Sequence, residues 1–112
     1  MLTETGRNVQ RDLWRGVLVS VVAGTGTRAE SEADTSLQAQ VITKPANLEN
    51  RAVGEVVSRG RLLSGDVNGT LLAEVGVTDG DGALLTRKTY LPLEKNETIE
   101  VEYEILFRVR NV

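Results

Sequence analysis

Residues 98–110 read TIEVEYEILFRVR, and this stretch decides the fold class of the chain. From residue 99 onward the odd-numbered positions are apolar, and the even-numbered positions are charged except for Leu106. Because successive side chains of a strand point to opposite faces of a sheet, this alternation predicts a β-strand with one apolar and one charged face. The apolar face belongs to a core, and the charged face belongs to water or to a neighbouring subunit.

The charged face of this strand carries the main candidate interaction residues, three acidic and then two basic: Glu100, Glu102, Glu104, Arg108 and Arg110. Two interpretations stay open. The face is either an ordinary solvated surface, or its acidic and basic ends pair between copies that lie head to tail or around a ring. At about 3.3 Å per residue the strand would be about 40 Å long, more than a small domain easily covers by itself.

The region before this strand predicts further antiparallel strands joined by short turns. Two Asp-Gly pairs at 79–82 favour a hairpin turn, because these residues tolerate a positive φ. Gly60 favours a bulge within its strand, and Pro92 is expected to interrupt the strand that precedes it. The strands are expected over residues 52–63, 70–77 and 83–90, with turns at 64–69 and 94–97.

The first residues predict a short helix that must dock on another element. Thr3 or Thr5 is the expected N-cap and Gly16 is placed to end the helix. A helix this short is marginal alone, so we expect it to dock on its own sheet or on a neighbouring subunit. For Trp14 two roles stay open, a partner anchor or a cap on the core of the sheet. The residues at helical spacing are Leu2, Gly6, Val9 and Leu13.

The stretch between this helix and residue 52 predicts one buried strand and then a long polar insertion. Residues 17–22 are rich in valine without alternation, which indicates a central strand buried on both faces. Residues 28–35 are expected to form a loop, and 36–41 a short helical turn. Lys44-Pro45 requires extended geometry, and 46–50 are expected to be a connection.

These elements predict a mainly β fold, an antiparallel β-sandwich-like domain with a short N-terminal α-helix. Residues 1–112 form one structural domain, with a docking helix at 1–15 and a β-sandwich at 16–112 that carries the polar insertion near 28–50. The 40% of hydrophobic residues suffices for a core, and the expected radius of gyration is about 13 Å.

Composition excludes several function classes. The chain has no histidine and no cysteine, which removes Ser-His-Asp and Cys-His catalysis, zinc fingers and disulfides. A net charge of −3 opposes binding to nucleic acid, and only 4% of the residues are aromatic. No apolar run approaches the roughly 20 residues of a membrane span, and no signal-peptide core is present. The expected protein is soluble, made in the cytoplasm, and binds neither nucleic acid nor membrane.

The remaining candidates for chemistry have simpler structural explanations. Asp79 and Asp81 resemble the start of a calcium loop, but position 12 of such a loop would be Tyr90, which cannot chelate. The glutamates of 98–110 lack an apolar pocket that would make one of them a glycosidase acid. The GTGT sequence at 24–27 has no phosphate-loop lysine, so we expect tight backbone packing there. We expect no catalytic residue, metal or cofactor, and no enzyme activity.

The order of short motifs resembles a family of small virion proteins of tailed bacteriophages, found in tail fibres, tail collars or baseplates. The motifs span nearly the whole chain: Leu2-Thr3, Gly6-Arg7-Asn8, Arg11-Asp12-Leu13, Val22 to Thr27, Asp34-Thr35-Ser36-Leu37, Asn68-Gly69-Thr70 to Leu72, Glu74 to Val77, Asp79-Gly80, Leu84-Leu85 with Arg87, Leu91-Pro92-Leu93 with Lys95, and the alternating strand from Ile99 to Val109.

This resemblance implies a structural component of a phage tail that acts by assembly with other virion proteins. It also implies location in the virion tail and a homo-oligomer, either a trimer or a hexameric ring. The alternatives are a capsid or head–tail decoration protein and a non-viral module that binds carbohydrate or another ligand, the latter poorly supplied with aromatic residues. An accessory subunit of an enzyme is a third possibility.

Overall fold

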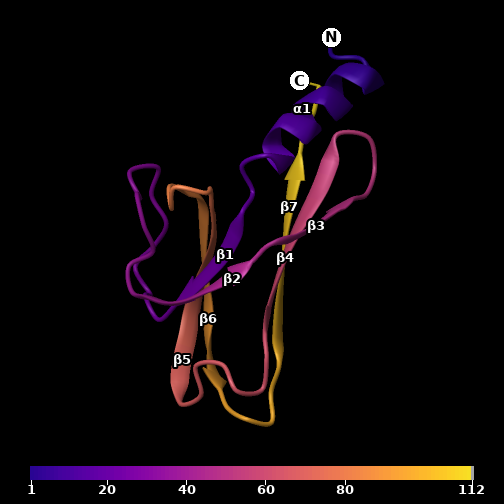
Figure 1. Cartoon of the computed structure of the whole chain (residues 1–112). Helices are drawn as coiled ribbons and strands as arrows, with labels where there is room; N and C mark the ends of the chain where they lie inside the picture. The colour runs from indigo at the N-terminus through magenta and orange to yellow at the C-terminus, as the bar shows by residue number, and fades with distance from the viewer. Residues whose placement is uncertain (112) are drawn as a thin grey trace.

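The computed structural model describes residues 1–111, over which the chain forms one helix and two antiparallel sheets (Figure 1). The first sheet has the strand order β2-β1-β5-β6, and the second sheet has the order β3-β4-β7. The predicted fold class is confirmed. The elements in chain order are α1 (Glu4–Arg15), β1 (Ser20–Gly24), β2 (Gln40–Pro45), β3 (Asn47–Asn50), β4 (Glu55–Leu62), β5 (Thr70–Thr78), β6 (Leu84–Lys95) and β7 (Val101–Arg108).

The helix begins and ends where its sequence predicts, and it docks on its own chain. Thr3 is the N-cap, accepting a hydrogen bond from the Gly6 N–H at 3.0 Å, and Gly16 follows the last turn. Asn8 Oδ1 accepts a hydrogen bond from the Gly54 N–H at 2.9 Å, which holds α1 beside the start of β4. Figure 1 shows α1 beside the ends of β4 and β7, at one end of the molecule.

The core lies between the two sheets. Val21, Val75 and Val77 from the first sheet meet Val56 from the second, and each is at most 7% exposed. Burying such side chains stabilises the fold by about 1.5–3 kcal/mol each. β1 is central and buried on both faces, as predicted, but it begins at Ser20, so Val17 and Val19 stay exposed.

Two expectations for the polar insertion were wrong. The predicted helical turn at 36–41 is an irregular segment that leads into β2, and the predicted connection at 46–50 contains β3. Both strands lie at sheet edges and their residues are mostly exposed, so they lack the apolar alternation that identifies a strand. Ala46, whose N–H donates to the Val19 carbonyl, marks the point where the chain passes from the first sheet to the second.

The two ends of the β6–β7 connection also differ from expectation. β6 continues through Pro92 to Lys95, because β6 is an edge strand with a register shift at this point, where a missing N–H is tolerated. β7 begins at Val101 rather than at residue 98, and the Ile99 N–H donates to the Asn96 carbonyl in the preceding turn. The predicted Asp-Gly hairpin turn is confirmed, with the Asp79 N–H bonded to the Ala83 carbonyl.

The molecule is longer than a compact domain of this size. Its radius of gyration is 14.9 Å and its longest extent is 48 Å, so the expected value of about 13 Å was too small. Figure 1 shows the cause, because α1 and the ends of β4 and β7 reach beyond the first sheet. Within the described residues, no helix is long and apolar enough to cross a membrane.

Gly60 provides close contact between the sheets, and the predicted bulge was wrong. Gly60 lies opposite Tyr103 in a β4–β7 register that runs without a shift from Glu55 to Leu62. A Cβ at Gly60 would lie 2.5 Å from the Cβ of Val21 in β1. A side chain at this position would therefore push the two sheets apart.

We expect Gly60→Val to lower the free energy of unfolding by at least about 1–3 kcal/mol, because overpacking forces side chains and backbone out of place. Denaturant melts measure the effect. Gly65→Ala is the matched control, because a Cβ at Gly65 meets no atom within 4 Å, and it is expected to change stability by less than about 1 kcal/mol. Equal losses from both variants would contradict the close contact at Gly60.

Candidate functional site

The first candidate surface lies at the C-terminal end of α1, next to the start of β6, and we call Leu13, Trp14, Val17 and Leu85 the helix-end surface. Leu13 is 64% exposed, Trp14 40% and Val17 39%, a high exposure for large apolar side chains. The four residues line an open groove of about 310 Å³, with Gln10 and Asp79 also at its wall. Single exposed apolar residues are normal, whereas a cluster of this kind is typical of an interaction site.

Trp14 takes part in both roles that the sequence leaves open. Its indole stacks on the Phe107 ring with 5.6 Å between ring centroids and 27° between planes, so it covers the core at the end of β7. The indole also lines the groove of the helix-end surface. Trp14 therefore holds α1 on the second sheet and forms part of the exposed apolar surface.

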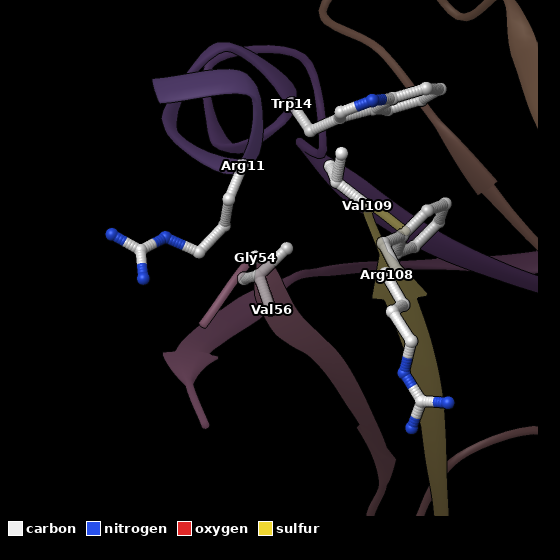
Figure 2. Close-up of a pocket in the computed structure, with 7 residues that line it drawn as sticks. Arg11, Trp14, Gly54, Val56, Arg108 and Val109 are labelled. Atoms are coloured by element: carbon white, nitrogen blue, oxygen red, sulfur yellow. The ribbon is translucent and has the colours of Figure 1, made fainter. Parts of the chain in front are cut away.

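A second, smaller hollow of about 90 Å³ lies beneath Trp14 (Figure 2). Gly54, Val56 and Val109 form much of its wall, while Arg11 and Arg108 extend away from one another at its rim. Each guanidinium is already paired, Arg11 with Asp12 at 3.0 Å and Arg108 with Glu55 at 2.7 Å. The hollow has the character of a packing gap between α1 and the second sheet.

The second candidate surface is the charged face of β7, where the sequence predicts acidic and basic residues on one side. The structure confirms the alternation, because β7 residues are alternately half-buried and exposed. Four of the five predicted residues are paired within the chain, mostly with residues of β4. Glu104 lies 2.9 Å from Arg59 and 3.2 Å from Arg51, and Glu102 lies 3.7 Å from Arg59. Glu100 lies 2.8 Å from Arg61, and Arg108 pairs with Glu55. Arg110 is exposed.

The pairing of Glu104 with Arg59 shifts the pKa values of both groups, and each shift favours the charged form. The hydrogen bond from Arg59 is the main cause that lowers the pKa of Glu104. Burial opposes it, and the positive charges of Arg59 and Arg51 add to the lowering. Hydrogen bonds to Glu49 and Glu104 raise the pKa of Arg59. Glu104 and Arg59 are therefore both charged at neutral pH. The pKa of Glu104 is lowered, whereas a general acid requires a raised carboxyl pKa.

A buried charged network that the sequence did not predict lies on the other face of the first sheet. Glu74 is 0% exposed and Arg87 is 8% exposed, and Arg87 Nε donates to Glu74 Oε1 at 3.0 Å. Arg87 also pairs with Asp34 at 3.1 Å and donates to the Arg28 carbonyl at 2.7 Å. The network holds the loop between β1 and β2 against the sheet.

The Glu74 carboxylate is saturated by backbone donors. Its oxygens accept hydrogen bonds from the N–H groups of Gly26, Gln38 and Ala39 at 2.8–2.9 Å, in addition to the bond from Arg87. A Cβ at Gly26 would lie 2.4 Å from Glu74 Oε2, so the glycine allows the loop to approach. This close approach confirms the tight backbone packing predicted for residues 24–27.

Glu74 stays ionised despite its burial. Burial raises the pKa of Glu74, but the hydrogen bonds from Ala39, Arg87, Gln38 and Gly26 together outweigh it, so its pKa lies below the usual value. A carboxylate with every lone pair engaged neither transfers a proton readily nor binds a ligand. The network is an internal support for the loop.

Lys95 is a second buried charge that the sequence missed. Its side chain is fully buried, and Nζ donates to the Asn68 side chain at 3.0 Å, to the Asn96 carbonyl at 3.1 Å and to the Ser64 carbonyl at 3.4 Å. These bonds join the β4–β5 turn to the β6–β7 turn. Sequence reasoning missed both buried charges for different reasons. The partners of Glu74 lie on the distant loop between β1 and β2, and Lys95 was expected in an exposed turn at 94–97, whereas it ends β6.

The aspartates of the hairpin turn serve the turn itself. Asp79 Oδ1 accepts hydrogen bonds from the N–H groups of Asp81 and Ala83, both at 2.9 Å. This is the local bonding that favours aspartate in turns. Across residues 1–111, no group of three or more acidic side chains is arranged to hold a metal ion.

Neither a scan against protein-family models nor a search of curated proteins finds a match to this chain. The two candidate functional surfaces of the described residues are the helix-end surface and the charged face of β7.

Proposed function

We propose that the protein is a structural component of a bacteriophage tail that acts by protein–protein assembly and not by catalysis. The observation that carries the proposal is the helix-end surface, where Leu13, Trp14 and Val17 are exposed together beside an open groove. Apolar side chains gathered around an aromatic residue form the usual centre of a protein interface.

The internal charges favour the same role. Glu74 and Arg87 form hydrogen bonds that hold the loop between β1 and β2, and Lys95 joins the β4–β5 turn to the β6–β7 turn. Such networks favour one defined shape, which a subunit of a larger assembly requires. The resemblance in motif order supplies the setting, a phage tail, and the neighbouring tail subunit is the proposed occupant of the helix-end surface.

Analysis of phage particles tests the setting. Particles produced from the genome that encodes this chain are expected to contain the protein by mass spectrometry, and immunogold labelling is expected to mark the tail. Genes for baseplate, fibre or tape-measure proteins are expected beside its gene. Particles without the protein, or a gene placed within a metabolic operon, would overturn the proposal.

The helix-end surface is tested by Leu13→Glu. Because Leu13 is 64% exposed, we expect the variant to unfold within about 0.5 kcal/mol of the wild type and to be incorporated into particles at least about tenfold less. Thr5→Glu is the matched control, because it adds the same charge to an exposed position on α1, two turns away from the groove. Normal incorporation of Leu13→Glu would show that this surface is not the contact.

A further inference from the structure

The four edge strands of the two sheets differ from one another. β2, β3, β6 and β7 each pair with one strand in the described chain, so each presents a free backbone edge. β2 ends at Pro45 and pairs with β1 through a register shift, and β3 has only four residues. β6 carries Pro92 and two register shifts, features that discourage pairing with another strand. β7 pairs with β4 without any shift, and residues 101–108 contain neither proline nor lysine. The β7 edge is thus regular and eight residues long, and its exposed charges are of both signs.

Hydrogen bonding fixes which backbone groups of β7 are free. The Val109 N–H donates to the Gly54 carbonyl at 2.9 Å, so residue 109 points its backbone toward the β4 side. Hydrogen-bonded and non-bonded pairs alternate along an antiparallel ladder. The odd-numbered residues of β7 therefore bond to β4, and the even-numbered residues direct their N–H and C=O groups outward. Among these even-numbered residues is Leu106, which is 44% exposed.

We propose that β7 pairs antiparallel with β7 of a second copy, about a twofold axis that passes through Leu106. The proposal rests on the assembly role proposed above and identifies one of its contacts. In this register Leu106 meets Leu106 of the second copy. Glu104 lies opposite Arg108 of the second copy, and Glu102 lies opposite Arg110 of the second copy. The two three-stranded sheets become one continuous sheet.

Charge complementarity across the strands supports this register. Arg59 lies opposite Glu104 in the β4–β7 ladder, and Glu55 lies opposite Arg108. In the dimer, four residues on neighbouring strands therefore lie side by side across the joined sheet. They are Arg59 and Glu104 of one copy, followed by Arg108 and Glu55 of the second copy, and their charges alternate in sign. Val57 lies opposite Leu106, so the central row is apolar on both sides of the axis. Opposite charges and apolar pairs directly across a strand boundary each stabilise a sheet.

Other registers are less favourable. A shift by one residue would place the apolar face of one β7 beside the charged face of the other, which a sheet with a buried face forbids. An axis through Glu104 sets two glutamates directly opposite each other, and like charges at such positions destabilise the pair. An axis through Ile105 leaves Leu106 opposite Glu104. Of these registers, only the one with its axis through Leu106 places opposite charges across from each other and leucine across from leucine.

A single cysteine tests the axis, because the chain has no cysteine of its own. We expect Leu106→Cys to form an intermolecular disulfide under mild oxidation. Its Cα atoms would lie about 5.5 Å apart across the axis, within the range that a disulfide spans. Glu104→Cys is the matched control on the same face of β7. In this register its two copies lie four residues apart along the strands, roughly 13 Å, so it is expected to remain uncross-linked.

Sedimentation of the full chain supplies the second measurement. The wild type is expected to dimerise, more weakly as salt screens the charge pairs, and Leu106→Lys is expected to raise the dimer dissociation constant at least about tenfold without loss of folding. A monomeric wild type, or cross-linking of Glu104→Cys in place of Leu106→Cys, would overturn the β7 pairing. Neither result bears on incorporation into phage particles. Leu13→Glu is expected to dimerise normally, so failure of the two proposals is distinguishable.

Discussion

Glu74→Gln is expected to lower the free energy of unfolding by about 3 kcal/mol, a large part of the roughly 5–15 kcal/mol that stabilises a small domain. The substituted amide removes the charge that compensates the buried Arg87 guanidinium. It also turns an N–H donor toward a site where the backbone N–H groups of Gly26 and Ala39 already donate. A buried donor without an acceptor adds to the loss.

The measurement is a pair of denaturant melts with Glu100→Gln as control. Glu100 makes a similar pair with Arg61 at 2.8 Å, but that pair is exposed, so its loss is expected to change stability by less than about 0.5 kcal/mol. Equal losses of unfolding free energy from the two substitutions would contradict the prediction that the buried ion pair contributes more to stability than the exposed one. We also expect faster proteolysis of the loop between β1 and β2 in Glu74→Gln, because the network holds that loop.

The difference in unfolding free energy between the wild type and Glu74→Gln is expected to depend on pH in a definite direction. The pKa of Glu74 in the folded protein lies below its ordinary value of 4.5, so its ionisation stabilises the fold above that value. The stabilisation is lost as the pH falls through the lower, folded pKa. Glutamine does not titrate, so the stability gap between wild type and Glu74→Gln is expected to be constant near neutrality and to narrow below about pH 4.5. A gap that widened on acidification would contradict the lowered pKa.

The parts of the fold that were predicted from sequence are those where local pattern and tertiary environment agree. β7 has alternating residues because one face covers the core, and the Asp79 turn needs only residues adjacent in sequence. β2 and β3 were missed because edge strands with exposed residues carry no apolar pattern. Their position depends on pairing with β1 and β4, which is a long-range property.

The same distinction between local pattern and long-range contact separates the site residues that the sequence predicted from those that it missed. Trp14 and the charged residues of β7 were recognised because each is conspicuous in its own segment. The helix-end surface was not, because it joins Leu13 and Val17 to Leu85, nearly 70 residues away in the chain. Glu74 and Arg87 were missed because their partners lie on the loop between β1 and β2. No signal within β5 or β6 alone indicates those contacts.

The stacking of Trp14 on Phe107 joins α1 to β7, so we expect the loss of this contact to weaken both the stability of the fold and the docking of the helix. Phe107→Ala is expected to lower the free energy of unfolding by about 3 kcal/mol, since Phe107 packs both against the core and under the indole. Because α1 has 12 residues and is marginal alone, the same substitution is expected to reduce helical circular dichroism before the sheets unfold. Trp14 is the sole tryptophan, so its fluorescence reports the undocking directly.

A double-mutant cycle isolates the contact itself. Trp14→Ala and Phe107→Ala are expected to be less than additive by about 0.5–1.5 kcal/mol, the range for stacked aromatic pairs. Glu102→Ala is the control on the other face of β7, where an exposed charge is expected to contribute less than about 0.5 kcal/mol. Strictly additive losses from the two aromatic substitutions would show that α1 is held by Asn8 and Gly54 without the ring contact. Equal losses from Glu102→Ala and Phe107→Ala would contradict the assignment of the two faces, and with it the charge pattern from which the pairing of β7 is inferred.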